Sequence, residues 1–230
     1  MMIKTLIPKI FLLLFIIFSF NCESSRRVLT EDGEPYNNIL YPLPWNAIHI
    51  GINSISIDRL IDAVNSVMPR LGINLLIVEV NYNFEYDSYP QLRDDNPVSK
   101  IQMQKLISAC RDNEIRIIPQ FQSLGHQSWS TKTHPLLKNF PEFDETPMIP
   151  LDNPGIYCRN WCPLNPDVYD VVFTLIDELI EVFTPNAFHV GMDEVRILAH
   201  NQCNRCRGYD PAVLYAKAVR DMHAHISGRH

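Results

Sequence analysis

The chain has no excess of basic residues and no basic cluster, so nothing in it favours binding to nucleic acid. Its 230 residues include 20 Lys and Arg against 26 Asp and Glu, a net charge of −6. A surface of that sign repels a phosphate backbone. The chain also has no internal repeat, and no low-complexity tract after residue 46. These absences argue against repeat architectures and favour one folded domain.

A long apolar run is absent too. The run at residues 10–18 follows Lys4 and Lys9 and is too short to span a bilayer as a stable helix. A charged start and a short apolar segment predict a signal peptide over residues 1–22. Cys22, directly after it, resembles the lipidated first residue of a bacterial lipoprotein, and an ordinary cleaved signal peptide is the alternative. Both alternatives predict an exported protein, which would be either a lipoprotein of the cell envelope or a periplasmic or secreted protein.

The rest of the chain divides into a tether and a domain. Residues 23–46 are polar and are predicted to link the anchor to the fold. Residues 47–230 are long enough for one hydrophobic core. In that segment, strand patterns alternate with helix patterns. The strands are expected at residues 47–53, 73–80, 115–121 and 188–195, and the helices at 57–68, 101–110, 166–179 and 211–226.

Local signals support these boundaries. Ser56 and Ser99 are predicted to cap the first two helices, and Gly72 stands where a helix end favours a left-handed residue. Pro166 and Pro211 suit the first turns of the last two helices. A loop of more than 40 residues follows the third strand. Because it is too long for a mere connection, we expect it to form part of a site.

Four βα units in a row predict a parallel sheet with right-handed crossovers. A complete (β/α)8 TIM barrel needs about 250 residues, so the expected fold class is α/β of the TIM-barrel type with only the first four βα units. Such a half barrel would be a fragment, a truncated reading frame or one partner of an assembled pair. A self-contained four-stranded α/β sandwich is the alternative.

Two adjacent carboxylates, Asp193 and Glu194, end the predicted fourth strand. Parallel α/β sheets and barrels place their chemistry at the carboxyl ends of their strands. Burial and a neighbouring negative charge raise the pKa of a carboxyl group, so one member of the pair could act as a general acid. The alternative is an acidic strand end that caps or salt-bridges the following loop.

Three motifs in this region resemble one family. His-Val-Gly-Met-Asp-Glu at residues 189–194 is similar to the His-x-Gly-Gly-Asp-Glu signature of glycoside hydrolase family 20, the β-N-acetylhexosaminidases. Residues 118–126 resemble that family's third-strand motif, which ends Pro-Gly-His. Residues 89–92 resemble its Tyr-Pro-x-Leu. The motifs occur in the family's order and cover residues 47 to 226, the amino-terminal half of its barrel.

The resemblance implies substrate-assisted hydrolysis of terminal N-acetylhexosamine residues. Glu194 would protonate the glycosidic oxygen, and Asp193 would orient the 2-acetamido group that attacks the anomeric carbon. No protein nucleophile is needed, which agrees with the lack of a Ser-His-Asp or Cys-His arrangement. The expected partner is an N-acetylhexosamine-containing glycan. No cofactor is expected, apart from a possible structural zinc.

Supporting residues also follow from the resemblance. His126 and His189 would line or brace the sugar pocket, Glu79 would bind sugar hydroxyls, and Trp129 could stack on a sugar face. Structural histidines and ordinary loop packing are the alternatives. The family's first-strand arginine has no counterpart, and Met192 replaces the second glycine of the signature. A catalytically inactive carbohydrate-binding surface lipoprotein therefore stays open as the alternative function.

Four cysteines lie in the two long loops of the predicted catalytic face. Cys158 and Cys162 are in the loop after the third strand, and Cys203 and Cys206 are in the loop after the fourth. Their spacing suits a structural zinc, whereas export favours disulfides. Either would join the two loops. A metal-sensing module built on these cysteines is a third functional hypothesis.

Overall fold

The computed structural model describes residues 45–229. The predicted signal peptide (1–22) with Cys22, and nearly all of the predicted tether (23–46), lie outside this range. Within it, no helix has both the length and the apolar composition needed to cross a membrane.

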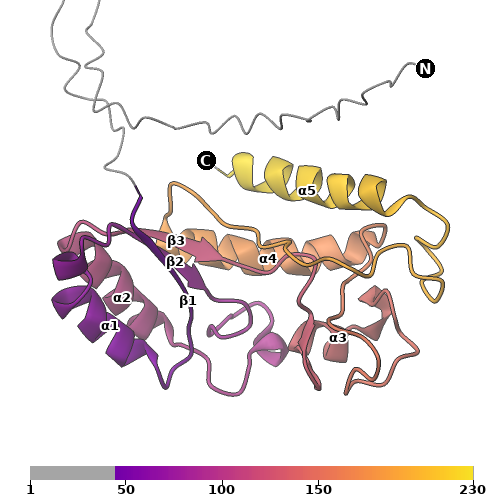
Figure 1. Cartoon of the computed structure of the whole chain (residues 1–230), viewed down its shortest axis with the longest axis horizontal. Coiled ribbons are helices and arrows are strands. Elements are labelled where there is room, and N and C mark those ends of the chain that lie inside the picture. The colour runs from indigo at the N-terminus through magenta and orange to yellow at the C-terminus, as the bar shows by residue number, and fades with distance from the viewer. Residues whose placement is uncertain (1–44, 230) are drawn as a thin grey trace, which may run out of the picture. The chain divides into compact units, whose positions relative to one another are not determined.

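A parallel three-stranded sheet organises the amino-terminal part of the domain (Figure 1). Its strands β1 (Ala47–Gly51), β2 (Leu75–Glu79) and β3 (Arg116–Gln120) stand in the order β1-β2-β3. They pair in register, with Ala47 opposite Leu75 and Leu75 opposite Arg116. The apolar run of β2 fits its central place, because Leu75, Leu76 and Val78 are buried although successive side chains point to opposite faces of the sheet. The carboxyl ends of all three strands meet at one edge.

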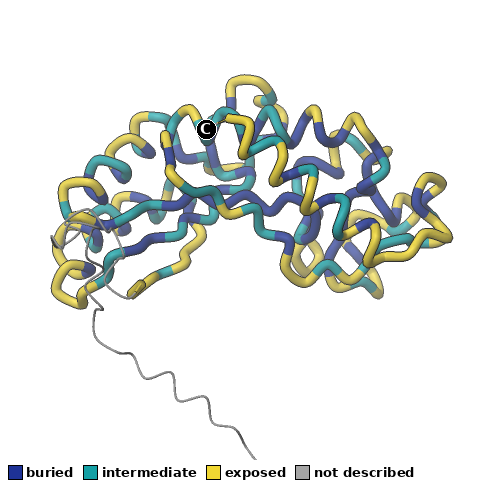
Figure 2. The backbone as a smooth tube through the Cα atoms, turned by 90° about the horizontal axis from the view of Figure 1, so that it is seen from above, coloured by how far each residue is buried: buried dark blue, intermediate teal, exposed yellow. Residues whose placement is uncertain are grey.

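Four long helices complete the alternation: α1 (Ile57–Ser66), α2 (Lys100–Asp112), α4 (Pro166–Phe183) and α5 (Pro211–Ser227). α1 packs against α2, and α2 packs against α4. Their buried faces repeat three and four residues apart and build the core with the sheet, as the burial colours in Figure 2 show. The predicted α/β fold with a parallel sheet is confirmed.

The helix ends follow local chemistry, with one correction. Ser99 forms a capping box with Gln102, and Gly72 takes the left-handed conformation with φ 68°. Ser56, predicted to cap α1, makes no capping hydrogen bond because its own backbone is already helical. Asn53 instead forms a side-chain turn just before the helix: its Oδ1 accepts hydrogen bonds from the backbone N–H groups of Ile55 and Ser56, at 3.0 Å each.

The fourth strand is the main departure from expectation. The segment 188–195 runs parallel to β3, but only His189 forms a bridge, opposite Gln120. After Val190 the backbone turns, because Gly191 and Met192 have φ of 67° and 73°. Among residues 188–195, only Met192 is buried, so the prediction of a buried strand is wrong. Two left-handed residues in succession end the extended conformation before the two acids.

The long loop after β3 has structure of its own. It contains the hairpin strands β4 (Ser128–Trp129) and β5 (Lys132–Thr133) and the short helix α3 (Pro135–Asn139). The loop also contains the single 3₁₀ turn η3 (Pro141–Phe143). Two more such turns lie before β3: η1 (Pro69–Leu71) and η2 (Pro90–Leu92). Backbone hydrogen bonds fold the loop back on itself, for example from the N–H of Gln127 to the carbonyl of Arg159 at 2.9 Å. The end of the loop therefore returns to the strand edge.

Candidate active site

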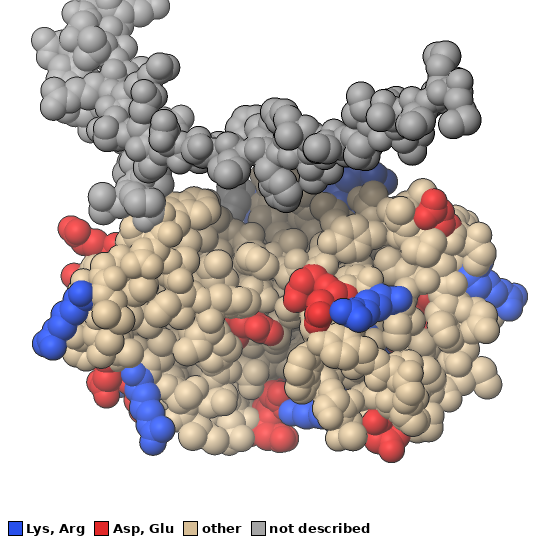
Figure 3. All heavy atoms as spheres, viewed as in Figure 1, with Lys and Arg blue, Asp and Glu red and all other residues tan. Residues whose placement is uncertain are grey.

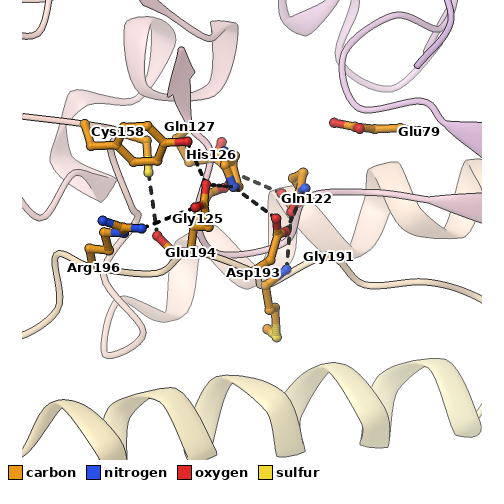
Figure 4. A network of polar contacts seen from close by, with 12 residues as sticks. Glu79, Gln122, Gly125, His126, Gln127, Cys158, Gly191, Asp193, Glu194 and Arg196 are labelled. Atoms are coloured by element: carbon orange, nitrogen blue, oxygen red, sulfur yellow. Dashed lines mark hydrogen bonds and ion pairs between the residues drawn. The ribbon is translucent and has the colours of Figure 1, made fainter. Parts of the chain in front are cut away.

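Asp193 and Glu194 lie at the carboxyl edge of the sheet, where the strand pattern places them. Met192 and Glu194 both have positive φ, 73° and 49°. Left-handed backbone at residues other than glycine costs of order 1–3 kcal/mol and clusters at functional sites. His126 lies between the two carboxylates, and their other partners differ, as Figure 4 shows for Gln122 and Arg196. Their side chains are 62% and 40% exposed, which leaves both open to a substrate.

Asp193 is held by two side chains from the turn after β3. Gln122 donates a hydrogen bond from Nε2 to its Oδ1 at 3.0 Å, and Nε2 of His126 lies 3.2 Å from its Oδ2. Partial burial acts to raise the pKa of Asp193, but the Gln122 hydrogen bond and the His126 ring outweigh it, and the pKa is lowered from its ordinary value. Asp193 is therefore ionised at neutral pH.

Glu194 has a different set of partners, drawn from the long loop and from its own strand end. Tyr157 donates a hydrogen bond to its Oε2 at 2.6 Å, and Arg196 donates one to its Oε1 at 3.3 Å. His126 also approaches Oε2, at 3.7 Å. The hydrogen bond to Glu194 is the main cause that raises the pKa of Tyr157. This phenol thus keeps its proton and stays a donor to Glu194.

His126 stands between the two carboxylates because a polar turn fixes it there. Its φ is 52°, and its side chain is only 14% exposed. Gln127 braces the turn: its Nε2 donates to the carbonyls of Gln122 and Gly125 at 3.0 and 2.9 Å, and its Oε1 accepts from the Tyr82 hydroxyl at 2.6 Å. The structure thus brings the predicted His126 into contact with both predicted acids.

The other predicted substrate-binding residues are spread around this centre. Glu79 ends β2 apart from the acid pair (Figure 4) and lies 3.6 Å from Nε2 of His49. His189 faces His49 with ring centroids 6.1 Å apart, and its Nδ1 accepts a hydrogen bond from the N–H of Gly191 at 3.1 Å. Burial is the main cause that lowers the pKa of His189, so its ring is neutral and can accept that bond. Trp129 is exposed and packs edge-on against Tyr157, with ring centroids 5.8 Å apart.

Sequence reasoning missed Gln122, Gln127, Tyr157 and Arg196. The two glutamines follow β3 closely, and the motif at residues 118–126 already includes Gln122. Tyr157 has no such signal, because the folded loop carries it to Glu194 over 37 residues of sequence.

The face that Figure 1 shows is drawn space-filled in Figure 3, where acidic side chains lie near the centre with a basic side chain beside them.

Gly191 is the position where this arrangement is most sensitive to a methyl group. Its φ is 67°, and an added Cβ would lie 2.1 Å from Oε1 and 2.9 Å from Cα of Gln122. We expect Gly191→Ala to lower the free energy of unfolding by about 1–3 kcal/mol, through overpacking and backbone strain. Gly208→Ala is the matched control, because Gly208 has φ 84° but nothing within 4 Å of its Cβ position. Equal losses in urea unfolding would show that the contact with Gln122 is unimportant.

The predicted set of four cysteines is corrected by the structure. Cys162, Cys203 and Cys206 gather with Glu145, all four being buried. Cys158 is not in this group: its Sγ points to the backbone carbonyl of Glu194 at 3.8 Å. The reason is the backbone course after Cys158: the carbonyl of the next residue, Arg159, accepts a hydrogen bond from the N–H of Gln127, whereas the N–H of Cys162 donates to the carbonyl of Phe143. None of the cysteines in the range 45–229 forms a disulfide.

A parallel βα series with paired acids at its strand ends is the architecture of barrel-type glycosidases. Residues 82–224, more than half of the chain, match the catalytic domain of glycosyl hydrolase family 20. The chain therefore belongs to this family. The matched range contains Asp193, Glu194, His126, His189 and Trp129, whereas Glu79 lies just before it.

Relatives share the family at low identity. Lacto-N-biosidase from Bifidobacterium bifidum is 29% identical over 153 residues, which are 66% of this chain and 12% of that protein. A β-hexosaminidase from Emericella nidulans is 25% identical over 188 residues, covering 70% of this chain and 29% of that protein. Hexosaminidase D from Bos taurus is 27% identical over 138 residues, 59% of this chain and 36% of that protein.

Solved structures show the same fold. The β-N-acetylhexosaminidase from Bacteroides fragilis superposes with a TM-score of 0.63 at 15% identity, covering 80% of this chain and 40% of that one. A mutant Streptomyces plicatus β-hexosaminidase in complex with its product GlcNAc superposes with a TM-score of 0.54 at 13% identity, covering 80% and 37%. The chain thus spans less than half of each of these relatives and solved chains.

Proposed function

We propose that this chain carries the acid and acetamide-orienting residues of a hydrolase that removes terminal N-acetylhexosamine residues with retention of configuration. The observation that carries the proposal is the unequal treatment of two adjacent acids. Asp193 is kept ionised by Gln122 and His126, while Glu194 is held by Tyr157 and Arg196. Environments that separate the roles of two carboxylates are typical of glycosidases.

In this mechanism Glu194 donates its proton to the glycosidic oxygen, and the bond from that oxygen to the anomeric carbon breaks. The carbonyl oxygen of the substrate's 2-acetamido group attacks the anomeric carbon from the other side and forms an oxazolinium ion. The carboxylate of Asp193 accepts a hydrogen bond from the acetamido N–H and stabilises the positive charge. Water, deprotonated by Glu194, then opens the ring and restores the acetamide. Two inversions give net retention.

The acetamido group provides the test of this function. We expect the purified natural gene product to release nitrophenol from a nitrophenyl N-acetyl-β-glucosaminide and not from the matched β-glucoside, which has a hydroxyl in place of the acetamide. The measurement is the absorbance of nitrophenolate for both substrates at equal concentration. Equal rates would show that the substrate gives no assistance. Binding of the sugar without any release would favour the alternative, an inactive carbohydrate-binding protein.

A further inference from the structure

A second cluster of chemically active side chains lies outside the carboxylate site. One ligand atom from each of Glu145, Cys162, Cys203 and Cys206 can be chosen so that all four lie within 4.8 Å of one another. We propose that these residues form a structural zinc site, with three thiolates and one carboxylate as ligands. The proposed hydrolysis uses none of the four, so the zinc site stands or falls independently of it.

The geometry suits a small tetrahedral ion. Thiolates and a carboxylate bind zinc at about 2.0–2.3 Å, which places tetrahedral ligand atoms roughly 3.3–3.8 Å apart. The cluster is within about an ångström of that spacing. The Cys206 Sγ already lies 2.8 Å from both carboxylate oxygens of Glu145. Cys203 and Cys206 also have the Cys-x-x-Cys spacing that structural zinc sites use.

The surroundings of Glu145 suit a bound cation. Its side chain is fully buried, and no lysine or arginine in the range 45–229 forms an ion pair with it. Its hydrogen-bond partners are the thiols of Cys206 and Cys203 and the backbone N–H of His200, which donates to Oε2 at 3.3 Å. Buried carboxylates are normally paired with a cation or coordinate a metal. The contact with His200 is the kind of outer hydrogen bond that orients a metal ligand.

The ligand chemistry selects zinc among common divalent ions. Magnesium and calcium require oxygen ligands, and three sulfur ligands exclude both. Thiolates with one carboxylate in a closed apolar shell fit a structural zinc. That shell is made by Leu214 of α5, which is buried with the cysteines, and by Leu164, Leu198 and Ala199 packed around them. All four side chains are buried, so the ion would have a structural role.

The site joins the two loops that hold the candidate active site. Glu145 and Cys162 belong to the loop that carries Tyr157, and Cys203 and Cys206 belong to the loop that begins after Glu194. A shared ion would fix the distance between these loops and, through Leu214, the start of α5. The zinc would thus act on the position of Tyr157 relative to Glu194.

Zinc analysis of the natural gene product tests the site. After dialysis against metal-free buffer, we expect about one zinc per chain by elemental analysis. Replacement by cobalt should give the intense visible bands of a tetrahedral ion and the near-ultraviolet charge-transfer bands of cobalt bound to thiolate. Absence of zinc, or a thiol titration of the denatured protein that shows Cys203 and Cys206 oxidised to a disulfide, would overturn the proposal.

Matched variants assign the ligands. Glu145→Gln and Cys206→Ser should lose zinc and the cobalt bands, while Cys158→Ser, which removes a buried thiol outside the cluster, should keep both. If Cys158→Ser loses zinc and Glu145→Gln retains it, the four-cysteine site is right and this one is wrong. The cobalt spectrum of the unaltered protein keeps the test valid where a variant fails to fold, because it reports the thiolate ligands directly.

Discussion

Glu194→Gln is expected to lower kcat for a nitrophenyl N-acetyl-β-glucosaminide by about 10²–10⁴-fold, the usual contribution of general acid–base catalysis. Glutamine has nearly the same shape but no proton to give to the glycosidic oxygen. Its amide oxygen can still accept the hydrogen bond that Tyr157 donates to Glu194 at 2.6 Å. The fold and the KM should therefore change little. Steady-state kinetics on the natural gene product measures both constants.

The leaving group provides a sharper form of the same experiment. A dinitrophenyl glycoside needs less protonation of its oxygen than a nitrophenyl glycoside, so the deficit of Glu194→Gln should shrink on it. A merely structural role for Glu194 would give equal deficits on both substrates. Glu181→Gln is the control, because Glu181 is an exposed carboxylate of α4 and should leave kcat unchanged. A Glu194→Gln variant with the natural kcat would contradict the assignment.

Elements with strong periodicity or clear end signals could be predicted from the sequence. α2 begins after the capping serine Ser99, and α4 and α5 begin at Pro166 and Pro211, as their first-turn chemistry indicates. The fourth strand could not be predicted, although its apolar pattern is good. Left-handed backbone at Met192 is set by tertiary contacts, among them the hydrogen bond from its N–H to Oε1 of Gln122 at 3.2 Å.

The candidate site divides in the same way. Asp193, Glu194 and His126 could be predicted because short sequence motifs mark them. Tyr157 could not, since a loop with its own hairpin decides where it lies. The cysteines show the same limit. Their spacing predicts a group of all four thiols, whereas the structure groups three of them with Glu145 and leaves Cys158 outside. A carboxylate in a mainly thiol site gives no spacing signal that a sequence pattern can detect.

Arg159→Met is expected to lower the free energy of unfolding by about 3–5 kcal/mol, as the loss of one partner from a buried ion pair does. The Arg159 and Asp144 side chains are 1% and 3% exposed and form an ion pair. The same guanidinium donates to the backbone carbonyls of Thr146, Ile149 and Pro150, at 3.2, 2.7 and 2.6 Å. Methionine fills much of the space but leaves Oδ2 of the Asp144 carboxylate without its positive partner and the three carbonyls without the guanidinium donor.

Two further variants separate the charge from the packing in urea unfolding. Arg111→Met removes an exposed arginine of α2 and should change the free energy of unfolding by less than about 0.5 kcal/mol. The double variant Asp144→Asn with Arg159→Met removes both charges, so it should recover part of the loss, because no buried charge is then unpaired. If Arg159→Met costs no more than Arg111→Met, the ion pair does not hold the loop. Since Tyr157 lies two residues from Arg159, a loop released in this way would also lose the donor that orients Glu194.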